Sequence, residues 1–182
     1  MLHLNPLAAR TLSAFRKRDQ RALRKLNDEV LATAAMQCDP VCFNLGVFSY
    51  ILSKIVSKPR FLQPELKSAL DGIDRVFSEI TGRMDRANEV EMLSLFKDLE
   101  KAISHLEEKD PRFIVDLVTK GKLKMAATFY AQGMSLGVAA DLTGLDKQEI
   151  LDYAGETMMF DRLKEEKSIN ERMKAARKLL SE

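Results

Sequence analysis

The sequence predicts an all-α protein, with an N-terminal helical bundle followed by a C-terminal helix-turn-helix unit and a tail helix. Hydrophobic residues make up 46% of the 182 residues, which is ample for a core, and only five prolines and eight glycines interrupt the chain. Apolar and polar residues do not alternate over any sustained stretch, so strands are not expected. Apolar residues instead recur at helical spacing, as at Leu66, Leu70, Ile73, Phe77 and Ile80.

Helix starts are marked three times by a capping residue followed by proline, at Asn5-Pro6, Asp39-Pro40 and Asp110-Pro111. Proline suits the first helical position because its missing N–H would be unpaired there in any case. Together with the apolar periodicity, these starts delimit a series of helices along the whole chain. The predicted helices span residues 6–17, 19–36, 40–57, 64–81, 86–108, 111–119, 123–132, 135–143, 146–154 and 168–180.

The most apolar run, residues 41–56, indicates a buried helix. It is too short to span a bilayer, and it is interrupted by the polar residues Asn44, Ser49, Ser53 and Lys54. The first residues of the chain lack the charged-then-apolar order of a signal peptide. With 31% charged residues and a net charge of +2, the sequence predicts a cytoplasmic protein with no membrane partner.

The sequence predicts neither a cofactor nor a metal site. The two cysteines, Cys38 and Cys42, would need further ligands for zinc, and neither histidine, His3 or His105, is spaced to pair with them. Two reduced cysteines in a cytosolic core account for the pattern. Phosphate-binding glycine loops, the nucleophile elbow and the zinc-protease motif are all absent from the sequence. We therefore expect a protein that is not an enzyme.

Residues 126–155 have the spacing of a helix-turn-helix. In the usual frame, which starts at Leu136, the three most demanding positions are occupied by Ala140, Gly144 and Ile150. Ala140 must be small because the second helix crosses above it, and Gly144 can take the left-handed conformation that ends the first helix. Ile150 fills the angle between the two helices. The second helix of such a motif is built to enter a DNA major groove.

The flanking residues agree with this frame. Ser135 can cap the first helix and Asp146 the second. The preceding amphipathic segment, residues 123–132, supplies the third helix that such a unit needs, and Gly133 ends it.

The order of residues in this stretch resembles that of a known family. The matching residues are Phe129, Tyr130, Gly133, Ser135, Leu136, Gly137, Ala139, Ala140, Leu142, Gly144, Leu145, Lys147 and Glu149. They resemble the short helix-turn-helix antitoxins that are paired with PIN-domain ribonuclease toxins in archaea and bacteria. The resemblance implies that the helix-turn-helix binds DNA or dimerises and that a C-terminal tail wraps the toxin. The residues upstream of this stretch carry no such resemblance.

The first functional interpretation is a regulator that binds duplex DNA as a dimer and also holds a protein partner. Lys147 and Gln148 on the second helix are the candidate base readers, for guanine and adenine. Lys122 and Lys124, just before the motif, are candidate phosphate contacts. Ser135, at the start of the first helix, completes the DNA-binding candidates.

The second interpretation is a helical protein–protein adaptor whose helix-turn-helix does not bind DNA. The helix that would face the groove carries three acids, Asp146, Glu149 and Asp152, against Lys147. Phosphates repel carboxylates, and among base edges a carboxylate accepts a hydrogen bond only from cytosine. A protein partner explains these acids more easily, and the sequence leaves both interpretations open.

A basic run near the N-terminus also has two interpretations. Its members are Arg10, Arg16, Lys17, Arg18, Arg21, Arg24 and Lys25, with Asp19 the only acid among them. One interpretation is a phosphate-binding patch. The other is a solvated helix face with some intrachain ion pairs.

The predicted tail helix, residues 168–180, is a candidate contact to a partner or to a second copy of the chain. Ser168 and Glu171 have the spacing of a capping box, and a narrow apolar stripe follows. The candidate partner-binding residues are Met159, Phe160, Ile169, Met173 and Leu180. We expect a homo-oligomer or a hetero-complex that uses residues after Thr157, although the tail could instead fold back on its own chain.

The predicted domain boundary lies near Glu108 to Asp110. Residues 1–109 contain five long helices, which is enough for an independent bundle. Residues 110–182 contain the helix-turn-helix region and the tail helix.

Overall fold

The computed structural model describes residues 4–37, 39–109, 116–162, 173, 174 and 177, and within these ranges all regular structure is helical. The protein is all-α, as the sequence predicts. The long helices are α1 (Leu4–Arg16), α2 (Gln20–Gln37), α3 (Pro40–Val56), α4 (Lys67–Arg83), α5 (Glu89–Glu108) and α6 (Leu117–Ala131). The shorter helices are α7 (Leu136–Thr143), α8 (Lys147–Glu156) and α9 (Met159–Arg162). Two 3₁₀ turns, η1 (Pro59–Leu62) and η2 (Pro64–Leu66), join α3 to α4.

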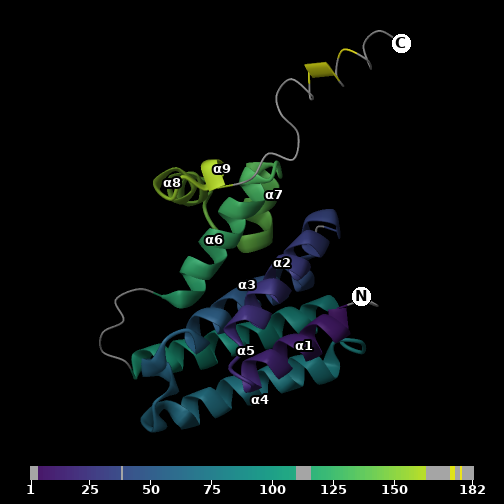
Figure 1. Cartoon of the computed structure of the whole chain (residues 1–182). Coiled ribbons are helices and arrows are strands. Elements are labelled where there is room, and N and C mark those ends of the chain that lie inside the picture. The colour runs from purple at the N-terminus through teal and green to yellow at the C-terminus, as the bar shows by residue number, and fades with distance from the viewer. Residues whose placement is uncertain (1–3, 38, 110–115, 163–172, 175–176, 178–182) are drawn as a thin grey trace.

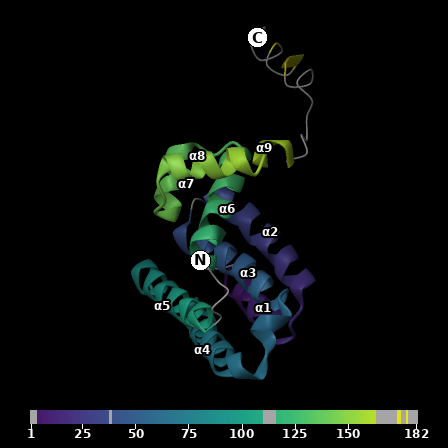
Figure 2. The same ribbon diagram turned by 90° about the vertical axis from the view of Figure 1, so that its left-hand side faces the viewer.

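Helices α1 to α5 pack side by side as a bundle, and α6 leads out of it to the short helices (Figure 1). The turned view in Figure 2 shows α7, α8 and α9 together on one side of the bundle, with α6 between them and the bundle. Because α6 contacts α3 and α5 as well as α7, α8 and α9, it attaches the short helices to the bundle.

The most apolar helix, α3, lies at the centre of the bundle. Thirteen of its seventeen residues are buried, which confirms the predicted buried helix. Phe48 stacks on Phe96 of α5 with ring centroids 5.4 Å apart. The buried hydroxyl of Ser49 donates to the carbonyl oxygen of Leu45 at 2.8 Å, so no donor is left unpaired by its burial.

One of the three predicted cap-proline starts is confirmed. Asp39 caps α3, where its carboxylate accepts hydrogen bonds from two backbone N–H groups of the first turn. The predicted start at Asn5-Pro6 is wrong, because α1 already includes Asn5, whose side chain donates instead to the carboxylate of Asp85. The start at Asp110-Pro111 lies outside the described residues.

The boundaries of α4 and α5 differ from those predicted. Residues 64–66, expected in a helix over 64–81, form a 3₁₀ turn before α4 begins. Helix α5 begins three residues later than predicted, because Asn88 caps it and Glu91 completes a capping box.

The predicted break between helices 111–119 and 123–132 is wrong, because α6 runs without interruption through residues 120–122. Residues 111–115 of the first predicted helix lie outside the described residues. Asp116 caps α6, its carboxylate accepting from the N–H of Val118 at 2.8 Å. Gly121 lies inside the helix where α6 packs on Ile51 and Val47 of α3. A Cβ atom at this position would lie 2.7 Å from Cγ1 of Ile51, so only glycine lets the two helices approach this closely without a shift.

Helix α6 contributes side chains to more than one core. Met125 and Phe129 lie in the main core with the bundle, and the Phe129 ring is 5.4 Å from that of Phe43. Ala126 and Ala127, on other faces of α6, lie in two smaller clusters with residues of α7, α8 and α9. The division of the chain after residue 109 stays a prediction. Helix α6 lies after this boundary, yet its side chains pack both on the bundle before it and on the short helices after it.

A buried polar contact also holds α6 on the bundle. The side-chain amide of Asn27, on α2, donates to the carbonyl oxygen of Gly46 at 2.8 Å and contacts the sulfur of Met125 at 3.5 Å. One side chain therefore links α2, α3 and α6.

The surroundings of the buried cysteine make it unreactive. The Cys42 thiol donates to the carbonyl oxygen of Val30 at 3.5 Å, and burial raises the pKa of this thiol to about 12, so it stays protonated. Cys38 lies outside the described residues. Among the residues that the structure describes, no group of three or more His, Cys, Asp or Glu side chains could hold a metal ion. None of the helices in these ranges is long and apolar enough to cross a membrane.

Candidate functional site

A tight turn joins α7 to α8 at the predicted place. Helix α7 ends at Gly144, which has a left-handed backbone with φ 69° and donates its N–H to the carbonyl oxygen of Ala140 at 2.8 Å. Asp146 caps α8 and forms a capping box with Glu149. At the start of α7, the Ser135 hydroxyl accepts the N–H of the third helical residue at 3.2 Å. The predicted turn and both predicted caps are therefore confirmed.

A small apolar core holds α6, α7 and α8 together. Its buried members are Ala126, Ala139, Ala140 and Ile150. Ile150 is fully buried, and Ala140 is only 8% exposed. Both residues therefore lie between the helices as predicted, and what this unit binds is a separate question.

Enlarging Ala140 is expected to disrupt this small core. A phenylalanine at this position should destabilise the fold by about 1–3 kcal/mol, because the ring overpacks the contact between α7 and α8. Urea unfolding followed by circular dichroism measures the change. Val138→Phe on the exposed side of the same helix is the control, and it should change the free energy of unfolding by less than about 0.5 kcal/mol. Equal effects at the two positions would contradict the packing described above.

The two lysines predicted to contact phosphates contact bundle helices instead. Lys122 Nζ lies 2.5 Å from Oε1 of Glu100 on α5, in a partly buried ion pair. Lys124 Nζ lies 4.4 Å from the centroid of the Tyr50 ring on α3. Both ammonium groups thus have partners within the chain that the sequence alone did not indicate.

The three remaining DNA-binding candidates are exposed. The hydroxyl of Ser135 is used as the cap of α7. Lys147 and Gln148 lie in the first turn of α8, where the Gln148 side-chain amide donates to the Asp152 carboxylate at 2.8 Å. The amide of Gln148 is therefore held by its own helix, and Lys147 is the one candidate without such a contact among the described residues.

The exposed surface of α7 and α8 is acidic. Its carboxylates, which we call the acidic surface, are Asp141, Asp146, Glu149, Asp152 and Glu156. Lys147 is the only basic residue between positions 136 and 156, so this segment has a net charge of −4 in a chain whose total is +2. Asp141 and Glu156 were not among the predicted site residues. The signal that could have found them is the near absence of lysine and arginine between positions 124 and 162.

Two exposed apolar side chains lie beside the junction of α8 and α9. Met158 is 65% exposed and Phe160 is 50% exposed. Met158 has a positive φ of 48°, a conformation that is uncommon for residues other than glycine. The Phe160 ring contacts that of Tyr130 edge-on at 5.4 Å between centroids, so one side of it is supported by α6.

The predicted partner-binding residues fall into three groups. Met159 is buried against Ala127 and Ala154, so it stabilises the chain's own core rather than presenting a free surface. Phe160 and Met173 are exposed. Ile169 and Leu180 lie outside the described residues, as does the predicted capping box of the tail helix.

The basic run of α1 and α2 is partly neutralised by ion pairs. Arg10 binds both carboxylate oxygens of Glu29 at 2.8 and 3.0 Å. Arg16 binds both oxygens of Asp74 on α4 at 2.7 and 2.9 Å. These hydrogen bonds lower the pKa of each carboxyl group and raise the pKa of each arginine. The interpretation as a solvated helix face with intrachain pairs accounts for these two arginines.

Replacing Asp74 with asparagine is expected to remove a contribution to stability that depends on pH. The hydrogen bonds from Arg16 hold the pKa of Asp74 below its usual value. At pH values above the unfolded pKa of about 3.9, the ionised carboxylate therefore stabilises the fold. This stabilisation is lost as the pH falls through the folded pKa, which is lower. The loss at neutral pH should be about 1 kcal/mol or less, because the pair is substantially exposed.

Urea unfolding of the original chain and of the Asp74→Asn variant, at about pH 7 and about pH 2, tests this expectation. The difference in the free energy of unfolding between the two proteins should be smaller at the lower pH. Asp71→Asn, on the same helix, is the matched control and should show no such change with pH. A difference of equal size at both pH values would contradict an ionic origin.

Comparisons with known proteins identified no relative of this chain. No protein-family model, no curated protein and no solved structure matches the chain. The resemblance of residues 126–155 to helix-turn-helix antitoxins therefore stays a prediction, and the function is argued from the residues themselves.

Proposed function

We propose that the protein is a helical protein–protein adaptor whose acidic surface docks a basic protein partner. The observation that carries this proposal is the charge of α7 and α8, where five exposed carboxylates surround one lysine. Surfaces of one sign attract partners of the other and set their orientation, and they repel partners of the same sign. A basic protein surface is complementary to this charge, whereas the phosphates of DNA are not.

The contacts of Lys122 and Lys124 also favour a protein partner over DNA. A DNA-binding helix depends on nearby cations that contact the phosphate backbone. The candidates for that role, Lys122 and Lys124, contact Glu100 and the Tyr50 ring of the bundle. Regulation through DNA binding remains the alternative function, and Lys147 is the strongest residue in its favour.

Apolar side chains next to the acidic surface supply the anchors that a protein interface needs. Binding energy in protein interfaces is concentrated in a few large side chains, with charged residues around them. Met158 and Phe160 are large and exposed, and Phe160 is held in place by Tyr130. The predicted use of residues after Thr157 in a homo-oligomer or a hetero-complex stays part of this proposal, with light scattering as its measurement.

Fluorescence anisotropy with a labelled duplex of mixed sequence separates the two functions. We expect the double variant Lys147→Ala, Gln148→Ala to bind duplex no differently from the original chain. If α8 reads bases, each substitution should instead cost about 1–3 kcal/mol of discrimination between sites. The control is Lys97→Ala on α5, which removes one exposed positive charge far from α8 in the chain. Salt-dependent duplex binding that only the α8 variant weakens would overturn the adaptor proposal.

A further inference from the structure

A cleft between α1 and α2 lies within the basic run. It has a volume of about 270 Å³ and is lined by Arg10, Ser13, Ala14, Lys17, Asp19, Ala22, Lys25 and Leu26. Arg10 lies three and four positions before Ser13 and Ala14 of α1, and Ala22 lies three and four positions before Lys25 and Leu26 of α2, so each helix turns one face to the cleft. Lys17 and Asp19 come from the turn between the two helices. The cleft therefore brings together basic residues that are separated along the chain.

The floor of this cleft is apolar and its rim is polar. Ala14 and Leu26 are buried and Ala22 is half-buried, so apolar side chains form the floor between the two helices. The rim carries two ammonium groups, one guanidinium, one hydroxyl and one carboxylate, from Lys17, Lys25, Arg10, Ser13 and Asp19. This combination suits a ligand with a negative head and a small apolar body.

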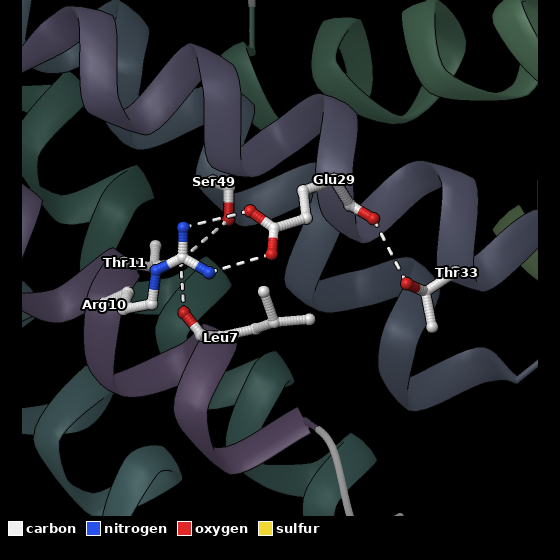
Figure 3. Close-up of polar contacts among 6 residues, drawn as sticks. All are labelled: Leu7, Arg10, Thr11, Glu29, Thr33 and Ser49. Atoms are coloured by element: carbon white, nitrogen blue, oxygen red, sulfur yellow. Dashed lines mark hydrogen bonds and ion pairs between the residues drawn. The ribbon is translucent and has the colours of Figure 1, made fainter.

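The charges around the cleft do not cancel. Glu29 on α2 holds the Arg10 guanidinium in a two-point contact, which fixes its position (Figure 3). The Asp19 carboxylate accepts the backbone N–H of Ala22. Neither Lys17 nor Lys25 forms an ion pair with another described residue, although the positive charge of Lys25 contributes to lowering the pKa of Glu29.

The turn between α1 and α2 places Lys17 and Asp19 on the cleft and leaves Arg18 outside it. Arg18 has a φ of 56°, a left-handed conformation that favours glycine. Its N–H donates to the carbonyl oxygen of Phe15, and the N–H of Asp19 donates to that of Ala14, each at 2.9 Å. An arginine thus occupies a helix end where glycine would be less strained, beside Lys17.

From this cleft we infer a binding site for a small soluble phosphomonoester. The phosphate lies between Lys17 and Lys25, where the Ser13 hydroxyl can donate to it, and the apolar part of the ligand lies on Ala22 and Leu26. The volume of about 270 Å³ is slightly below the range of small-molecule sites, about 300–1,000 Å³, so the apolar part of the ligand is no larger than one ring. This site is independent of the acidic surface and of the adaptor function.

Isothermal titration calorimetry with phenyl phosphate tests the inference, because this probe joins a phosphomonoester to a compact apolar ring. The full chain should bind it saturably, and inorganic phosphate should bind more weakly because it lacks the apolar part. The double variant Lys17→Gln, Lys25→Gln should bind at least about tenfold more weakly. Ala22→Leu, which fills the floor, should weaken phenyl phosphate more than it weakens inorganic phosphate.

The matched control is the double variant Arg18→Gln, Arg21→Gln, which removes the same charge from the same basic run but outside the cleft. It should bind phenyl phosphate within about twofold of the original chain. Circular dichroism checks that each variant remains helical. An equal loss in both double variants would overturn the site in favour of a general charge effect, as would the absence of saturable binding. Binding to vesicles that contain phosphatidic acid, without binding of phenyl phosphate, would overturn it in favour of a lipid surface.

Discussion

Replacing Phe129 with alanine is expected to lower the free energy of unfolding by about 3–5 kcal/mol. The ring is fully buried in the main core and lies 5.4 Å from Phe43 on α3, so its removal leaves a cavity between α3 and α6. Because α6 attaches the short helices to the bundle, the same change should also weaken their attachment. Urea unfolding measures the loss of stability.

The matched control for this substitution is Val90→Ala on α5. Val90 is apolar but 78% exposed, so its truncation should change stability by less than about 0.5 kcal/mol. A loss below about 1 kcal/mol for Phe129→Ala would show that α6 is not packed in the main core as described.

Replacing Ile150 with alanine is expected to cost about 2–5 kcal/mol, and to do so locally. Ile150 is fully buried in the small core of Ala126, Ala139 and Ala140, where no other large side chain is fully buried. Without it, α7 and α8 lose the one large fully buried side chain of the small core that they share with α6. The bundle does not depend on this contact, so it should remain folded.

Hydrogen exchange measured by mass spectrometry distinguishes the two substitutions. In Ile150→Ala, exchange should accelerate in residues 136–156 and change little in α1 to α5. In Phe129→Ala, protection should also fall in α3. Uniform acceleration along the chain in Ile150→Ala would contradict a separate small core.

The fold class and the buried helix were predictable because both depend on composition and local periodicity. The run 41–56 is apolar on most of its faces, and a helix at the centre of a bundle can bury them. The turn at Gly144 was predictable for a similar reason, since a glycine, two caps and a small residue at fixed spacing are local signals. The capping box of Asn88 and Glu91 was an equally local signal that the prediction missed.

Helix α6 was not predictable in the same way. Its continuity through Gly121 depends on the side chain of Ile51, which is seventy residues away in the chain. A glycine inside a helix weakens it locally, and here the close packing on α3 outweighs that cost. Nothing in the sequence near Gly121 indicates this contact.

The candidate site was predicted only in part for the same physical reason. The sequence placed Lys122 and Lys124 just before the helix-turn-helix, but it could not show that Glu100 and Tyr50 of the bundle would contact them. Exposure of Asp141 and Glu156 likewise depends on which sides of α7 and α8 are buried. Local signals therefore gave the scaffold of the site, and tertiary packing decided which of its charges face outwards.

Charge reversal on the acidic surface tests the docking proposal most directly. The double variant Asp152→Lys, Glu156→Lys changes two exposed carboxylates that do not cap a helix, and Asp28→Lys, Glu65→Lys makes the same change in charge on α2 and η2. Each protein is immobilised and used to capture partners from native lysate with and without nuclease treatment, and bound proteins are quantified by mass spectrometry. We predict a protein that the original chain and the control capture equally and that the acidic-surface variant loses. Equal capture by all three proteins, or capture that nuclease abolishes, would contradict a protein-docking role for this surface.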